Sequence, residues 1–189
     1  MQFTNSDVVG AVIIDPDPRK DERGRFSRSW CSHEFAEHGL DFIPVQANMV
    51  FSHFKGTVRG MHFQIAPAWE AKLVRCTRGT AFDVVLDVRP ESASFRKWIG
   101  VEISAENGRM VYVPAGCAHG CQSLEDATEI YYFASCFYTP ACARGVRFDD
   151  PAFNIAWPLP AVHLSKQDRG WPLAEKQLLP FDDLHKVPA

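Results

Sequence analysis

Short runs in which apolar and polar residues alternate recur between residues 72 and 138, and each run ends at Gly, Pro, Asn or Asp. A period of two is typical of a β-strand whose faces meet different surroundings. The run 81–88, in which Phe82, Val84 and Leu86 occupy alternate positions, is one example. The pattern predicts a protein built mainly of β-strands.

Two further runs, 99–103 and 110–113, flank the dipeptide Asn107-Gly108. Asn-Gly readily adopts the positive backbone angles of a tight two-residue turn. We therefore predict that these two runs pair as a β-hairpin.

Helical signals are few. Ser32 precedes residues 33–38 and Gly39, which predicts a helix of about two turns with Ser32 as its N-cap and Gly39 as its stop. The segment 165–168 resembles one capped helical turn. A few short helices are therefore expected beside the strands.

The length of 189 residues and the hydrophobic content of 46% are enough for one buried core, so a single domain is expected over residues 1–189. The formal net charge of -3 gives no basic field to attract nucleic acid or an anionic membrane. Neither is expected as a partner. After Tyr138 the chain is rich in Pro and Trp, and residues of about 150–189 are interpreted as a tail packed on the core.

Residues 1–12 lack a basic start followed by an apolar run, and no apolar stretch is long enough to span a bilayer. Six cysteines are scattered without a Cys-x-x-Cys pair, which argues against a zinc knuckle. Such cysteines are typical of reduced thiols. We therefore expect a cytoplasmic protein.

Polar residues concentrate in three segments: 59–64, 70–75 and 114–120. These segments resemble the two motifs of a cupin. The matching residues are His62, Glu70 and Gly79 in the first motif and Gly108, Pro114, Gly116 and His119 in the second. The resemblance implies an antiparallel β-barrel of the jelly-roll type.

Gln64 stands where metal-binding cupins have a second histidine, so a strong nitrogen ligand is missing. We therefore expect neither a metal nor another cofactor. The alternative is a metal-dependent cupin enzyme that uses His62, Glu70 and His119.

The string Arg-Gly-Met-His-Phe-Gln at 59–64 is also the most specific string of the dTDP-4-dehydrorhamnose 3,5-epimerase family, which the chain resembles from about residue 8 to 173. Matching segments lie on both sides of this string: 21–26, 46–48, 144–151 and 164–169. The resemblance implies an isomerase that acts on a nucleotide-linked 4-keto-6-deoxyhexose in deoxysugar biosynthesis.

Carbons 3 and 5 of such a sugar flank the keto group, so loss of either proton gives a stabilised enolate, and reprotonation from the opposite face inverts the centre. By resemblance, His62 is the base, Asp168 is its partner and Tyr132 is the acid. Lys72 and His119 are the groups near the carbonyl oxygen. Taken without the family, His119 and Tyr132 have structural interpretations as well, in strand bonding and in packing.

By resemblance, Arg23 and Arg59 are expected to bind the pyrophosphate, to which arginine forks are suited. Gln46 and Asn48 are expected to be polar contacts of the substrate. Tyr138 is the residue expected to stack on the base, although core packing is its alternative.

Three residues depart from the family pattern: Arg28, Ala143 and Gln167. We interpret them as changes in substrate recognition, so the nucleotide, the sugar and the number of inverted centres stay open. A binder of nucleotide sugars without activity is a further alternative. The resemblance also implies a homodimer, with strands of residues 1–50 crossing to the partner, where Arg23 or Arg28 would complete the neighbour's pocket.

Overall fold

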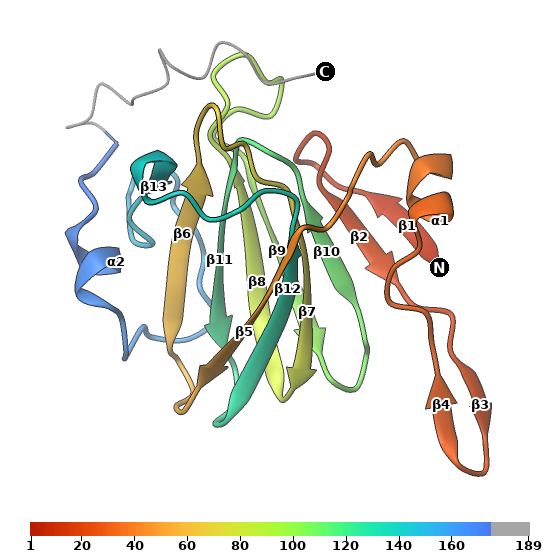
Figure 1. Ribbon diagram of the computed structural model, residues 1–189. Helices are drawn as coiled ribbons and strands as arrows, with labels where there is room; N and C mark the ends of the chain where they lie inside the picture. Colours follow the sequence, from red (N-terminus) through yellow and green to blue (C-terminus); the bar gives the residue numbers. More distant parts are fainter. Residues whose placement is uncertain (175–189) are drawn as a thin grey trace.

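Two antiparallel β-sheets face each other across a shared apolar interior, as the computed structural model of residues 1–174 shows (Figure 1). The six-stranded sheet has the order β1 (Gln2–Asn5), β2 (Val12–Asp15), β10 (Met110–Val113), β7 (Lys72–Arg78), β12 (Thr128–Ala134), β5 (Gln46–Ser52). The five-stranded sheet has the order β13 (Ala143–Gly145), β6 (Val58–Gln64), β11 (Cys117–Ser123), β8 (Thr80–Asp87), β9 (Trp98–Ser104). The predicted mainly β fold of the cupin jelly-roll type is confirmed.

The interior between the sheets is filled largely by β-branched and small residues, including Val74 of β7, Val85 of β8 and Ile130 of β12. These residues are fully or almost fully buried. Burial of apolar surface is the main contribution to folding, so this layer holds the two sheets together. The polar residues discussed below occupy the part of the interior that opens to solvent.

Strand β8 confirms the strand predicted over 81–88 and uses both of its faces. Phe82, Val84 and Leu86 point outward and pack with Phe153 in a cluster that covers the five-stranded sheet. Asp83 and Val85 lie on the other face, toward the interior, where Asp83 is completely buried. The period of two therefore separates a tail-covered face from an interior face.

The hairpin predicted at Asn107-Gly108 is wrong. Strands do lie on either side of it, but β9 pairs with β8 whereas β10 pairs with β2 and β7. The turn itself is locally as expected, because Gly108 has a φ of 63° and the Asn107 side chain accepts a hydrogen bond from the Ser104 amide at 2.9 Å. The turn connects the two sheets and does not join neighbours in one sheet.

The first predicted helix exists as α1 (Ser32–Glu37), and Gly39 follows it with a φ of 72°. Ser32 is the first helical residue, not the cap, because Cys31 occupies the N-cap position without a side-chain hydrogen bond. The second helix, α2 (Lys166–Gly170), is capped as expected, since Ser165 Oγ accepts a hydrogen bond from the Asp168 amide at 3.0 Å. A 3₁₀ turn covers Pro140–Cys142.

The segment that follows β13 packs on the outer face of the five-stranded sheet. Phe153 is buried there, and the indole of Trp157 donates a hydrogen bond to the Phe148 carbonyl at 2.8 Å. The part of the predicted tail at 175–189 lies outside the described residues. All six cysteines are free, as expected. In the described chain, no helix has the length and apolar character needed to cross a membrane.

A two-stranded hairpin, β3 (Arg19–Asp21) and β4 (Gly24–Phe26), projects away from both sheets (Figure 1). Its residues are almost all exposed, and Phe26 has 73% of its surface accessible. An exposed hairpin of this size gains little stability from its own packing.

Candidate active site

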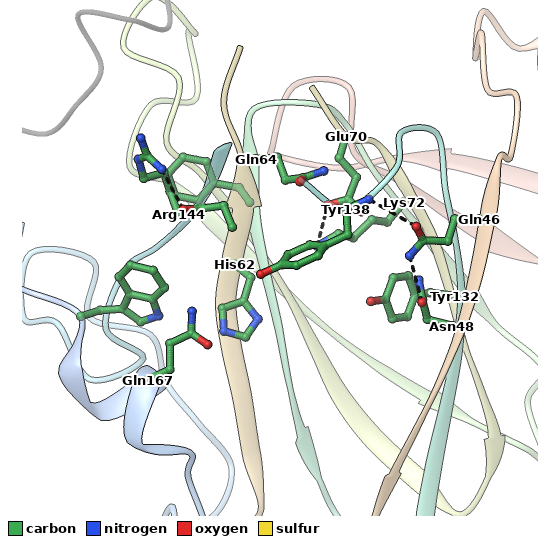
Figure 2. A pocket seen from close by; sticks show the side chains of 13 residues that line it. Gln46, Asn48, His62, Gln64, Glu70, Lys72, Tyr132, Tyr138, Arg144 and Gln167 are labelled. Carbon is green, nitrogen blue, oxygen red and sulfur yellow. Dashed lines mark hydrogen bonds and ion pairs between the residues drawn. The ribbon is translucent and has the colours of Figure 1, made fainter. Parts of the chain in front are cut away.

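Two adjoining cavities open at one end of the interior. The first has a volume of about 370 Å³, the second about 230 Å³, and both are lined by His62, Lys72, Tyr132 and Gln167. The other residues of the first cavity are Gln46, Asn48, Phe63, Gln64, Glu70, Tyr138, Ala143, Arg144 and Trp171 (Figure 2). The other residues of the second are Val50, Arg59, His119, Cys121, Ile130, Ser165 and Asp168.

His62 lies on β6 with its ring between these cavities, and 42% of its side chain is exposed. Its Nε2 lies 2.5 Å from Oδ1 of Asp168, whose side chain is only 5% exposed. The short helix α2 presents Asp168, because the Ser165 cap fixes its first turn. A carboxylate on one ring nitrogen orients an imidazole and stabilises its charged form.

The environment of Asp168 favours its ionised form. Burial acts to raise the pKa of this carboxyl group, but the hydrogen bond and positive charge of His62, the Ser165 hydroxyl and the Gly60 amide together outweigh burial. The pKa of Asp168 therefore lies below its ordinary value. A carboxylate kept ionised at neutral pH can pair with an imidazolium that forms during proton transfer.

His119 forms a second pair with an aspartate. It faces His62 across the β6–β11 ladder, and its Nε2 lies 2.8 Å from Oδ1 of Asp83 on β8. Two glycines allow β6 and β11 to approach closely here: a Cβ on Gly60 would lie 2.5 Å from the Cα of Gly120. A larger residue at Gly60 would push apart the strands that carry the two histidines.

Tyr132 lies on β12, in the sheet opposite His62, and its phenol ring lines the same two cavities. Burial raises the pKa of this phenol above its ordinary value, and the negative charge of Glu70 raises it further. The group therefore carries its proton at neutral pH. A base and a protonated acid thus line one shared space from opposite sheets.

Lys72 begins β7 and is buried, with 10% of its side chain exposed. Its Nζ lies 3.5 Å from Oε2 of Glu70 and 5.9 Å from the centroid of the Tyr132 ring. A cation held at this depth is a suitable group to stabilise a developing enolate oxygen.

The side chain of Gln64 is hydrogen-bonded to the backbone of a neighbouring loop. Its Oε1 accepts a hydrogen bond from the Thr139 amide at 2.7 Å, and its Nε2 donates one to the Phe137 carbonyl at 3.3 Å. These bonds fix the loop that carries Tyr138. Among residues 1–174, no three His, Cys, Asp or Glu side chains gather into a group that could hold a metal ion, so His62, Glu70 and His119 are not arranged as the ligand set of the metal-dependent alternative.

The residues expected to bind the nucleotide do not all lie in one cavity. Gln46 and Asn48 line the first cavity and share a hydrogen bond of 3.0 Å, and Tyr138 is 59% exposed at its wall, so it is not a core residue. Arg59 lines the second cavity, where Ser52 Oγ accepts a hydrogen bond from its Nε at 3.1 Å. Arg23 lies far down the projecting β3–β4 hairpin, bound to Asp21 at 2.6 Å and outside both cavities.

Two of the three departures from the family pattern face the first cavity, namely Ala143 and Gln167. The third, Arg28, forms an ion pair of 2.6 Å with Glu34 and lines neither cavity. Of the three departures, only Ala143 and Gln167 are therefore in a position to contact a ligand in the cavity of the same chain.

Sequence reasoning did not assign roles to three residues that the fold brings to this site: Asp83, Arg144 and Trp171. Asp83 carried a partial signal, because it shares a strand face with the apolar Val85, and the structure buries both completely. Arg144 and Trp171 carried none, since their place depends on how the segment after β12 folds back over β6.

Comparison with known proteins gives one consistent result. The family model described as dTDP-4-dehydrorhamnose 3,5-epimerase matches residues 5–176. A dTDP-4-dehydrorhamnose 3,5-epimerase of Sinorhizobium fredii is 41% identical over 173 residues, which are 91% of this chain and 89% of that protein.

Solved structures agree with this match. The epimerase RmlC of Legionella pneumophila, in complex with dTDP-4-keto-L-rhamnose, has a TM-score of 0.91 and 33% identity, over 100% of this chain and 99% of that one. ChmJ, a 3'-monoepimerase of Streptomyces bikiniensis in complex with dTDP-quinovose, has a TM-score of 0.81 and 36% identity, over 88% and 84%. The chain belongs to the dTDP-4-dehydrorhamnose 3,5-epimerase family.

Proposed function

We propose that this protein epimerises carbon 3, carbon 5 or both in a nucleotide-linked 4-keto-6-deoxyhexose, with His62 as the base and Tyr132 as the acid. The observation that carries the proposal is the shared space between them: an imidazole paired at 2.5 Å with a buried carboxylate lines the same cavities as a protonated phenol on the opposite sheet. Membership of an epimerase family supports the same reaction class.

In this mechanism, His62 removes the proton next to the ketone, and the Asp168 carboxylate stabilises the imidazolium that results. The electron pair of the broken C–H bond moves into the enolate, whose oxygen gains negative charge beside Lys72 and His119. Tyr132 returns a proton to the same carbon from the opposite face of the ring. His62 then releases the extra proton to solvent and Tyr132 regains one from solvent, so both groups return to their starting states. The reaction as proposed needs neither a metal nor a redox cofactor.

The part of the substrate that does not react is a nucleoside diphosphate, which the protein binds. Gln46 and Asn48 supply amide groups in the first cavity, the Arg59 guanidinium suits a phosphate, and the exposed Tyr138 ring suits a nucleotide base. Structural neighbours with bound dTDP-sugars make thymidine the first nucleotide to test.

We further propose a cytoplasmic homodimer whose projecting β3–β4 hairpin carries Arg23 to the partner's cavity. The support is that Arg23 is 83% exposed and lies outside both cavities of its own chain. We also propose a single domain, and the pairing of Asp168 in the tail with His62 of β6 supports it for the described residues 1–174.

The proposal is tested by NMR in heavy water with thymidine-, cytidine- and uridine-linked 4-keto-6-deoxy sugars. Deuterium is expected at carbon 3, carbon 5 or both with at least one nucleotide, and the labelled positions identify the inverted centres. His62→Ala is expected to lower exchange by roughly a hundred- to ten-thousandfold. The matched control is His33→Ala, which removes an exposed histidine of α1 and leaves exchange intact. Absence of exchange with all three nucleotides would rule out the proposal.

A further inference from the structure

Glu70 has no role in the mechanism described above, yet it is buried in the wall of the first cavity (Figure 2). Only 8% of its side chain is exposed. Carboxylates are rarely buried to this extent without a partner, because desolvation disfavours their charge. The partner is Lys72, whose Nζ lies 3.5 Å from Oε2 of Glu70, the one ion pair of Lys72 within the described chain.

Lys72 is held from two directions. Glu70 binds its ammonium group, and the ring of Tyr132 lies 5.9 Å from the same nitrogen, near the limit of cation–π attraction. A lysine on its own is a flexible chain with four rotatable carbon–carbon or carbon–nitrogen links and loses much side-chain entropy when fixed. The two contacts therefore define where the cation sits relative to the proposed acid.

Glu70 also acts on Tyr132 through its charge. Burial is the largest cause of the raised pKa of this phenol, and the negative charge of Glu70 is the next. A nearby carboxylate disfavours ionisation of a phenol because two negative charges would then face each other.

The remaining charged or titratable groups around these cavities are His62, Asp168, His119, Cys121, Arg59, Arg144 and Tyr138, the last of which is 59% exposed. Apart from Tyr138, each of these groups is hydrogen-bonded to another group or stays neutral. His62 pairs with Asp168 and His119 with Asp83, while burial first of all raises the pKa of the Cys121 thiol to about 12, which keeps it neutral. The guanidinium groups of Arg59 and Arg144 bond to backbone carbonyls.

We propose that Glu70 is a positioning residue for the epimerisation: it holds the Lys72 ammonium 5.9 Å from the centre of the Tyr132 ring and places a negative charge in the cavity that the phenol lines. The inference rests on the function proposed above. Glu70 touches neither the sugar nor the reacting carbons in this role, and it acts through Lys72 and Tyr132.

The first test does not depend on enzymatic activity. Tyrosine ionisation is followed by ultraviolet absorbance in the wild type and in Glu70→Gln, each with and without Tyr132→Phe, so that the difference isolates Tyr132. In Glu70→Gln the Tyr132 transition is expected to move down by about one pH unit. Glu102→Gln, which removes an exposed carboxylate of β9, is the matched control and leaves the transition in place.

The second test follows kcat against pH by deuterium exchange. In Glu70→Gln the alkaline limb of kcat is expected to move down by a similar amount, because the acid loses its proton sooner, while KM changes little. Glu70→Asp keeps the negative charge on a shorter side chain. It is therefore expected to return the alkaline limb to its wild-type position but not to restore the full kcat. If the wild type shows no exchange with any nucleotide, the proposed function fails while the absorbance titration still decides the role of Glu70.

A third variant protects the test against misfolding of Glu70→Gln. Lys72→Met removes the counter-ion and leaves Glu70 charged beside the phenol, so the Tyr132 transition is expected to move up, opposite to Glu70→Gln. The proposal is overturned if the transition in a folded Glu70→Gln coincides with that of the wild type. A downward shift or no shift in Lys72→Met overturns it as well.

Discussion

His62 and His119 face each other across β6 and β11, and each bonds to an aspartate, but the two aspartates come from different parts of the chain. Asp83 belongs to β8, the strand hydrogen-bonded to β11. Asp168 belongs to the short helix α2, 106 residues from His62 in sequence. One pair is internal to a sheet, and the other joins a sheet to a tail.

Burial differs in the same way. The side chain of His119 is 11% exposed and that of Asp83 is completely buried, with its Oδ2 lacking a hydrogen-bond partner. The side chain of His62 is 42% exposed. An imidazole that gives and takes protons must reach its substrate, whereas a buried pair gains a fixed position. The difference in exposure supports the proposed role of His62 in proton transfer, and it gives His119 a fixed position beside the cavity.

The largest effect is expected from Asp168→Asn, which keeps the shape of the side chain but removes its charge. The imidazolium of His62 loses its counter-ion, so kcat is expected to fall by roughly a hundredfold or more. Steady-state rates of deuterium exchange measure this. Asp149→Asn, a change in an exposed pair with Arg147, is the control. A kcat within a few-fold of the wild type would remove the distinction between the two pairs.

A smaller effect, on stability, is expected from Asp83→Ala. The buried His119 then loses its hydrogen-bond acceptor, which costs about 1–3 kcal/mol in the free energy of unfolding. Urea unfolding measures the difference, with Asp7→Ala at an exposed position as the control. If Asp83→Ala unfolds at the urea concentration of the wild type, the pair in the sheet contributes nothing to stability.

Ser165→Ala sharpens the comparison from the side of the tail. It removes the N-cap hydroxyl of α2, which accepts a hydrogen bond from the Asp168 amide. The free energy that stabilises α2 is expected to fall by about 1 kcal/mol, and Asp168 is then held less firmly. We expect kcat to fall several-fold, less than in Asp168→Asn. A matched change at the other helix, Ser32→Ala, has no cap to remove and is expected to leave kcat unchanged.

The smallest effect is a pH dependence of stability. The pKa of Asp168 is lowered in the folded protein, so its contribution to stability is present above its ordinary pKa and is lost as the pH falls through the lowered value. The difference in unfolding free energy between the wild type and Asp168→Asn is therefore expected to shrink below about pH 5. Urea unfolding at a series of pH values checks this, and a difference that grows on acidification contradicts it.

The parts of the site that were predictable from the sequence lie in short segments with their own signatures. His62 sits in the string 59–64, and Ser165 marks the start of α2 because a capping serine acts over one turn. The pairing of the strands on either side of Asn107-Gly108 was not predictable in this way. Asn-Gly fixes the backbone of a turn, but the choice of strand partner depends on residues far along the chain, here β8 for β9 and β2 and β7 for β10.

The amino-acid sequence alone determined the β-rich class, the family resemblance and the candidates for proton transfer, because strand periodicity and motif strings are local properties. Tertiary structure alone decided that Asp83 pairs with His119, that Glu70 pairs with Lys72, and that Arg23 lies outside both cavities. These are consequences of sheet register and of where a hairpin projects. Both are set by the packing of residues distant in sequence, so no window of neighbouring residues contains them.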